Sequence, residues 1–273
     1  PKLGIELEDI DDWNCCGASV GHLQGGRLGQ AALSGRNLAQ AQRQSAENDV
    51  ITACAACYLN THATNEEIRE NSQFKDDINE ALGAAGKSYD GQLKVRHACE
   101  VMVNDVGMEA IKEQVTHSLE GLKVAGYVGC QTVRPFAGTE NGGDYDSYDK
   151  PRFLDDIIEA TGAEAIDFNN ATSCCGGAVT VVDSSKTLHL MKKILEEAHA
   201  KGADMIATPC PLCQTNVEVY QSQVNAEFGT DYNIPVVFHT QLMAVAFGLD
   251  ANKDAALNQN IIKADKLLAK AKG

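Results

Sequence analysis

The chain lacks the features that would place it in a membrane or on nucleic acid. No stretch of its 273 residues approaches the ~20 apolar residues that a membrane-spanning helix needs. Its 23 lysines and arginines are outnumbered by 38 aspartates and glutamates, and a net charge of −15 argues against nucleic acid or an anionic membrane surface as a partner. Solubility alone also explains this surplus of acidic residues, so the charge argues against these two partners without indicating another.

Several signature sequences are missing as well. Residues 1–6 have neither the basic start nor the apolar core of a signal peptide, and we therefore expect a cytoplasmic protein. The glycines of residues 21–29 are not followed by the Gly-Lys-Ser/Thr that cradles phosphate, which excludes a nucleotide loop. There is no ferredoxin-type cysteine run and no flavin fingerprint. Electrons for a redox reaction would have to come from other subunits.

Cysteine, in contrast, is abundant, with ten residues. Clustered cysteines in a reducing compartment indicate metal binding or redox chemistry rather than disulfides. A Cys-Cys-Gly element occurs twice, and each copy is followed by a Cys-x-x-Cys pair after 37 and 34 residues respectively. Eight cysteines therefore belong to one duplicated pattern. The first copy comprises Cys15, Cys16, Cys54 and Cys57, and the second comprises Cys174, Cys175, Cys210 and Cys213.

The two remaining cysteines differ in kind. Cys130 ends an apolar run, residues 124–129, that predicts a strand closed by a glycine turn, and it precedes the second pattern. The counterpart of Cys130 in the first copy would fall before residue 1, so we expect the chain to lack roughly 30 N-terminal residues including a cysteine. Cys99 has no counterpart, and we expect it to be a buried helical residue outside any site.

Alternating strands and helices predict an α/β fold with parallel pairing in each half. Each Cys-x-x-Cys pair follows a short apolar strand, where open α/β sheets place their ligands. We expect domains at residues 1–115 and 116–273, and an exposed acidic loop at 138–144. Expected strands are 50–53, 93–97, 124–129, 205–208 and 235–239, and expected helices are 28–39, 108–119, 151–162, 188–202 and 261–268.

His97 and His239 each end one of these strands, in matching positions of the two halves. Such a histidine can cap the following helix or pack at the strand end. Alternatively, it can donate a hydrogen bond to a sulfur of a metal centre. The sequence leaves both alternatives open.

The cysteine pattern favours iron–sulfur over zinc. A Cys₄ zinc site is conceivable, but adjacent cysteines reach a single tetrahedral ion awkwardly. Five cysteines in the second half also exceed what one zinc ion needs, whereas a polynuclear centre accommodates them.

With its repeated CCG and Cys-x-x-Cys elements, the chain resembles the B subunit of heterodisulfide reductase. The likeness includes the opening segment GIELEDIDDWNCCG and the segment PRFLDDIIEATGAE. It implies two Rossmann-like CCG domains that face each other, each with a noncubane [4Fe–4S] cluster, and reductive cleavage or formation of a disulfide between the clusters. It further implies two partners in the same complex, a ferredoxin-like iron–sulfur protein (the C subunit) and an FAD-containing protein (the A subunit).

By this resemblance the cysteines divide into two ligand sets, with the CCG cysteines next to the chemistry. The first cluster would be held by Cys15, Cys16, Cys54 and Cys57 with a fifth ligand outside this chain, and the second by Cys130, Cys174, Cys175, Cys210 and Cys213. The catalytic residues would be Cys15, Cys16, Cys174 and Cys175.

Three other functions remain open. Similar proteins act in sulfur oxidation, on protein-bound sulfur rather than a small disulfide. Others are electron-transfer subunits of succinate, lactate or glycerol-3-phosphate dehydrogenases that feed quinone. A zinc or cluster scaffold without redox activity is the third.

Overall fold

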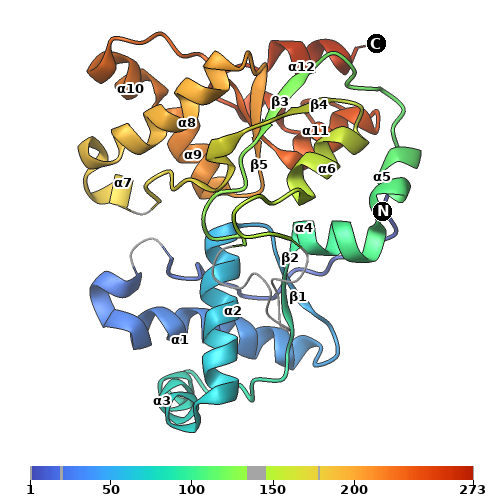
Figure 1. Ribbon diagram of the computed structural model, residues 1–273. Coiled ribbons are helices and arrows are strands. Elements are labelled where there is room, and N and C mark those ends of the chain that lie inside the picture. Colours follow the sequence, from blue (N-terminus) through green and yellow to red (C-terminus); the bar gives the residue numbers. More distant parts are fainter. Residues whose placement is uncertain (1, 19–20, 134–145, 178, 273) are drawn as a thin grey trace.

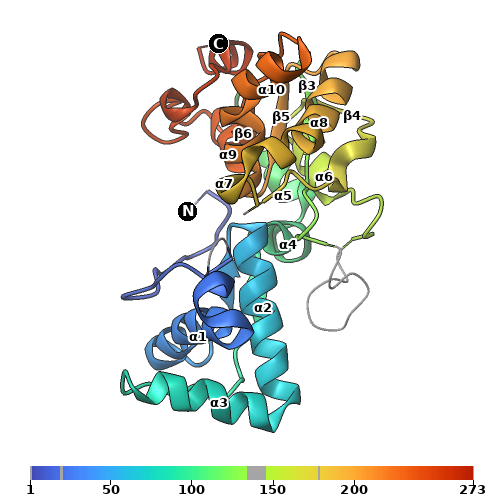
Figure 2. The same cartoon turned by 90° about the vertical axis from the view of Figure 1, so that its left-hand side faces the viewer.

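The computed structural model describes residues 2–18, 21–133, 146–177 and 179–272. Two lobes lie one above the other, the first built from the N-terminal part of the chain and the second from the C-terminal part (Figures 1 and 2). The predicted loop at 138–144 lies outside the described residues.

The first lobe is mainly helical around a two-stranded parallel sheet. Strands β1 and β2 pair in register from Val50 opposite Val95 to Thr52 opposite His97. Its elements are α1 (Gly21–Gln44), β1 (Val50–Thr52), α2 (Ala55–Glu70), α3 (Ser72–Gly83) and β2 (Val95–His97), followed by α4 (Ala98–Val101), the π-helical turn η1 (Met102–Val106) and α5 (Met108–Glu113).

The second lobe is a four-stranded, wholly parallel sheet of order β4-β3-β5-β6. Helices α6, α8, α9 and α11 cover it (Figure 1). Its elements are β3 (Lys123–Gly126), α6 (Phe153–Ala160), β4 (Glu164–Ile166), η2 (Asn169–Thr172), α7 (Val179–Val182), η3 (Ser184–Lys186), α8 (Leu188–Ala200), β5 (Met205–Thr208), α9 (Pro211–Val219), α10 (Gln221–Phe228), β6 (Val236–Phe238), α11 (His239–Ala246), η4 (Leu257–Gln259) and α12 (Asp265–Lys270).

The duplication in the sequence is a duplication in the structure. In each half a short strand, β1 or β5, leads into a helix that begins at a Cys-x-x-Cys pair, α2 or α9. The neighbouring strand, β2 or β6, then leads into α4 or α11. The predicted α/β fold with two related halves is confirmed.

Alternating side chains in the second sheet fill two cores. Val124 and Val237 pack into one, and Ala125 and Val236 into the other, as the two-residue period of a strand dictates. Both faces of a parallel sheet are thus buried. A third core, which includes Leu38 and Ile78, belongs to the first lobe.

Residues of the first half also enter the cores of the second. Ala55, in the first turn of α2, lies in the core that contains Cys210 and Cys213. Cys99 and Ile111 lie fully buried in the core on the other face of the sheet. The two halves therefore share packed surfaces.

Several predicted helices are shorter than expected, and for two of them the structure shows the reason. The helix expected at 108–119 ends at Glu113 as α5, because the backbone N–H groups of Thr116 and His117 donate to the Ala246 carbonyl instead. The helix expected at 261–268 begins only at Asp265 as α12. Ile261 is 64% exposed, and the N–H of Ile262 donates to Glu218, which draws this backbone out of a helix.

Candidate metal and redox centre

The two Cys-x-x-Cys pairs occupy equivalent helix starts. Cys54 is the N-cap residue of α2 and Cys210 that of α9, both with extended backbone conformations. Cys57 and Cys213 follow in the first turns. The unpaired N–H groups and positive dipole at a helix N-terminus favour thiolates. Both pairs are therefore placed to bind a cation through sulfur.

The second CCG element follows β4 and has one buried and one exposed thiol. Cys175 is 4% exposed, whereas Cys174 faces outward and accepts a hydrogen bond from the N–H of Gly176 at 3.3 Å. Gly176 has φ +99°, and a Cβ there would lie 2.6 Å from the Thr187 side chain. Only glycine fits this close, left-handed turn.

Asn216 on α9 fixes the same loop. Its side-chain amide donates to the carbonyls of Cys175 and Gly177, at 3.3 and 3.1 Å, and to the Thr180 hydroxyl at 3.0 Å. The Cys175 sulfur lies 3.5 Å from the same nitrogen. The equivalent Asn60 on α2 instead donates to the carbonyl of Ala56 in its own helix.

All five cysteines of the second half gather at the carboxyl ends of its strands. Cys130 follows β3, the CCG element follows β4 and the Cys-x-x-Cys pair follows β5. The fully buried Tyr127 has a pKa raised by burial and by the charges of four of these cysteines. They are Cys213, Cys175, Cys130 and Cys174.

Sulfur contacts connect these cysteines. The Sγ atoms of Cys175 and Cys213 lie 3.7 Å apart, and Cys130 makes a hydrogen bond with Cys174. Gly129 passes beside this group, because a Cβ there would lie 3.0 Å from the Cys213 sulfur.

The sulfur contacts continue across the boundary between the halves. The Cys54 thiol of the first half makes a hydrogen bond with Cys210 of the second, and the backbone of Ala56 contributes another to the same sulfur. Within the first half, Cys54 contacts Cys57, which in turn contacts Cys16. A line of sulfur atoms therefore joins the two duplicated sites.

These contacts separate the thiols by acidity. Hydrogen bonds from Cys213 and then Cys54 lower the pKa of Cys210 to about 2, and one from Cys57 leads the causes that lower the pKa of Cys16 to about 6. Cys54 donates to Cys210, and its pKa rises to about 12. A hydrogen bond with Cys213 is also the main cause that lowers the pKa of Cys175. Each half thus holds at least one thiol that favours the thiolate, the form in which cysteine binds metal.

His97 and His239 lie fully buried where the halves meet. The Nδ1 atom of His97 accepts a hydrogen bond from the N–H of Cys99 at 3.2 Å, so His97 caps α4. The Nε2 atom of His239 lies 3.6 Å from the Cys99 sulfur. The expectation that Cys99 is buried on a helix is confirmed, and burial raises the pKa of its thiol.

The donor set fits a polynuclear centre better than a single ion. Among the described residues, no three His, Cys, Asp or Glu side chains are arranged to hold one metal ion. A zinc site would need four ligands around one point. The nine thiols, which contact one another in pairs, provide soft sulfur ligands at several points, as an iron–sulfur centre requires. The division of these thiols into two ligand sets stays a prediction.

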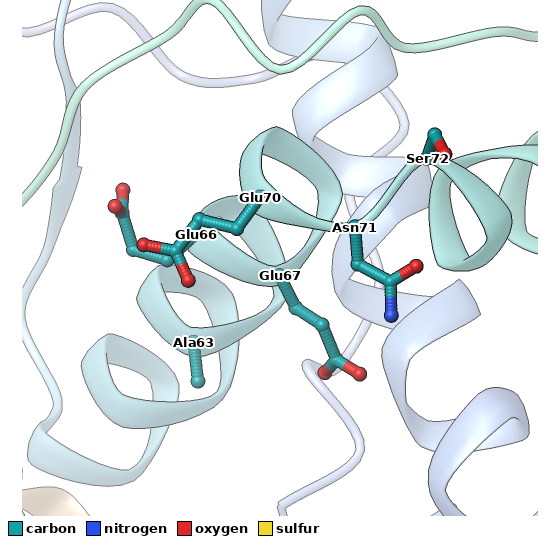
Figure 3. Close-up of a pocket in the computed structure, with 6 residues that line it drawn as sticks. All are labelled: Ala63, Glu66, Glu67, Glu70, Asn71 and Ser72. Atoms are coloured by element: carbon teal, nitrogen blue, oxygen red, sulfur yellow. The ribbon is translucent and has the colours of Figure 1, made fainter.

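An acidic hollow lies elsewhere, where α2 turns into α3. It has a volume of about 650 Å³ and is lined by Glu66, Glu67 and Glu70 together with Asn71 and Ser72 (Figure 3). Its carboxylates lie at the far end of α2 from Cys54, so the hollow is no part of the cysteine site (Figure 1).

Comparison with known proteins identifies the class. The model of the CCG cysteine-rich domain matches residues 1–61 and 124–218, which contain both CCG elements, both Cys-x-x-Cys pairs and Cys130. A crystal structure of a hypothetical protein from Helicobacter pylori has the same fold, with a TM-score of 0.65 and 15% identity over 86% of this chain. This chain spans 42% of that one.

Relatives over nearly the whole length are subunits of reductases. The B subunit of a ferredoxin:CoB-CoM heterodisulfide reductase from Methanosarcina mazei is 32% identical over 98% of this chain and 88% of its own. The membrane anchor subunit of an 8-methylmenaquinol:fumarate reductase from Wolinella succinogenes is also 32% identical, over 98% of this chain and 90% of its own. The chain therefore belongs to the family of duplicated CCG cysteine-rich proteins that includes the B subunit of heterodisulfide reductase.

One name among these relatives mentions a membrane. Within the ranges that the structure describes, no helix is both long enough and apolar enough to cross a bilayer.

Proposed function

We propose that the chain is the iron–sulfur subunit of a heterodisulfide reductase-type complex and that it cleaves a disulfide with two electrons. The observation that carries this proposal is the contact between Cys54 and Cys210, which brings two equivalent cysteine sets together. A disulfide takes up two electrons and two protons to give two thiols. Two paired sites divide that task equally.

Two noncubane [4Fe–4S] clusters, held by the eight cysteines of the duplicated pattern together with Cys130, would supply one electron each. The chain's own residues set the geometry. Buried Cys16 and Cys175 anchor the CCG elements, while exposed Cys15 and Cys174 face solvent, where a substrate arrives. The glycine after each cysteine pair permits a close backbone approach.

The electrons would come from two partners of the same complex, the ferredoxin-like iron–sulfur protein and the FAD-containing protein that the family resemblance implies. The CoB-CoM heterodisulfide named for the Methanosarcina relative is the first substrate to test. The reaction can run in either direction, because thiol–disulfide couples are reversible.

A second candidate rests on the Wolinella relative, whose name places it with 8-methylmenaquinol and fumarate. In that case the same cysteine sets would pass electrons between a quinone and a partner dehydrogenase. A sulfur-oxidising complex that acts on protein-bound sulfur would use the same centres in the oxidative direction.

Anaerobic purification followed by iron and acid-labile sulfide analysis tests the cofactor. Iron with matching sulfide and an EPR signal on reduction or oxidation is the expected result. Zinc without sulfide would exclude every redox alternative. Turnover with a heterodisulfide, compared with a menaquinol analogue, then distinguishes the first candidate from the second.

A further inference from the structure

His97 has a hydrogen-bond donor for which the described residues provide no partner. Its Nδ1 atom accepts from the Cys99 N–H, so this nitrogen carries no proton. The proton of the neutral ring therefore resides on Nε2.

That Nε2–H group is fully enclosed. His97 is 0% exposed, and Nε2 has no hydrogen-bond partner within the described part of the chain. An unsatisfied buried donor costs about 1–3 kcal/mol, and native proteins seldom leave one without a reason. The site therefore calls for an acceptor.

The ring of Tyr58 in the first half packs edge-on against His97, with 5.7 Å between the ring centroids, and the remaining neighbours of the ring belong to the second half. The charge of Cys210 acts on His97, and the carbonyl of Pro209 lies near it without reaching hydrogen-bond geometry at Nε2. The Cys210 sulfur already receives hydrogen bonds from Cys54 and from the backbone of Ala56, both in the first half. It is the point on which donors of the first half converge.

We propose that His97 Nε2–H donates a hydrogen bond to the Cys210 sulfur once that sulfur binds a metal centre, so that a residue of the first half tunes the redox centre of the second. The inference rests on the proposed iron–sulfur function. A donor to a ligand sulfur stabilises the reduced, more negative form of the centre and thereby raises its reduction potential. His97 is a positioning and tuning residue that does not bind the metal.

His239 does not provide the mirror image of this contact. Its Nε2 atom lies against the Cys99 sulfur, and the backbone of Thr208 and the ring of Phe238, both in its own half, lie beside it. The two matching histidines therefore differ in their surroundings: among the described residues, His97 lies next to a cysteine of the duplicated pattern and His239 next to Cys99.

Two substitutions separate capping from donation. In His97→Asn the side-chain oxygen takes the place of Nδ1 and still caps α4, but no donor reaches the position of Nε2. In His97→Gln the amide nitrogen lies near the position of Nε2 and restores the donor. His62→Asn is the control, because this buried histidine contacts the Val95 carbonyl and Tyr58 in the first lobe.

The measurement is an EPR-monitored redox titration of the anaerobically prepared protein, with iron and sulfide counted on the same samples. His97→Asn should shift the midpoint potential of one centre to a more negative value, with His97→Gln and His62→Asn close to the parent. Loss of iron in His97→Asn with retention in His97→Gln would support the same contact. An unchanged potential in His97→Asn, or equal iron loss in both His97 variants, would overturn it. Absence of iron from the parent protein would instead overturn the proposed function.

Discussion

At the scale of single residues, the cysteines divide by environment more than by sequence position. Cys16 and Cys210 favour the thiolate because neighbouring thiols donate to them. Cys99 is buried among apolar side chains, and its thiol is held protonated by burial alone. Proximity to other sulfur atoms, rather than the residue type, distinguishes a candidate ligand from a core residue.

Cys99→Ala should therefore leave the metal content unchanged. The substitution removes one buried sulfur and its contact with His239, with a stability cost of about 1 kcal/mol. Iron analysis and EPR of the variant check this, with Cys213→Ala as the matched change inside the cysteine set. Loss of a whole centre in Cys99→Ala would show that Cys99 is a ligand.

At the scale of the elements, strand ends and helix starts bring the site together. Every cysteine of the second half follows β3, β4 or β5, and α9 then fixes the CCG loop through Asn216. In the first half, within the part of the chain that the structure describes, the corresponding Asn60 donates to the Ala56 carbonyl of its own helix.

Asn216→Ala should loosen the second CCG loop. The change removes several buried hydrogen bonds from one amide, at about 1 kcal/mol for each effective bond. We expect the Asn216→Ala protein to lose iron to a chelator faster and to have a lower free energy of unfolding. Asn60→Ala should change both quantities only slightly. Equal effects of the two substitutions would show that the amide has no special role at the second loop.

A second element-scale prediction concerns Asp155 on α6, whose carboxylate packs against Gly126 of β3. Burial raises its pKa from 3.8 to about 7, although nearby Arg152 opposes the shift. The folded state then holds a proton that the unfolded state has lost, so its contribution to stability is present below pH 4 and disappears as the pH rises toward 7.

Asp155→Asn should remove the loss of stability that accompanies ionisation of Asp155, because an amide does not ionise. Relative to the parent, the variant should gain about 1–3 kcal/mol between pH 4 and pH 8 in denaturant titrations. A difference between the two proteins that does not change with pH would contradict the raised pKa.

At the scale of the whole molecule, the sequence predicts the duplication but not the contact between the two halves. The strands before both Cys-x-x-Cys pairs, and those that end at His97 and before His239, follow from short apolar runs. The sequence does not predict strand β4, because residues 164–166 are too few to show a period. The apolar spacing through residue 119 predicts a longer helix than the structure has, because tertiary hydrogen bonds to the Ala246 carbonyl end α5 early.

The contact that joins the halves cannot be predicted from the local sequence. Cys54 and Cys210 are far apart along the chain and meet because Ala55 and Cys99 pack into the cores of the second lobe. Burial of those side chains is a property of the assembled fold. The expectation of two facing halves came from the family resemblance and from the requirement that both sites share a substrate.

The central claim is that the two cysteine sets act together on one disulfide. Cys175→Ala removes the buried sulfur of the second CCG element while leaving Cys15, Cys16, Cys54 and Cys57 in place. A reduced viologen supplies electrons directly, so that missing partner proteins do not limit the rate. Iron analysis first establishes that the first centre is retained.

The decisive measurement is the rate of heterodisulfide cleavage by this variant with viologen as donor. Because one remaining centre provides only one of the two electrons at the disulfide, we expect cleavage to fall to the background rate. Substantial residual cleavage with the second centre absent would show that the centres work in series as an electron wire, and the paired account would then be wrong.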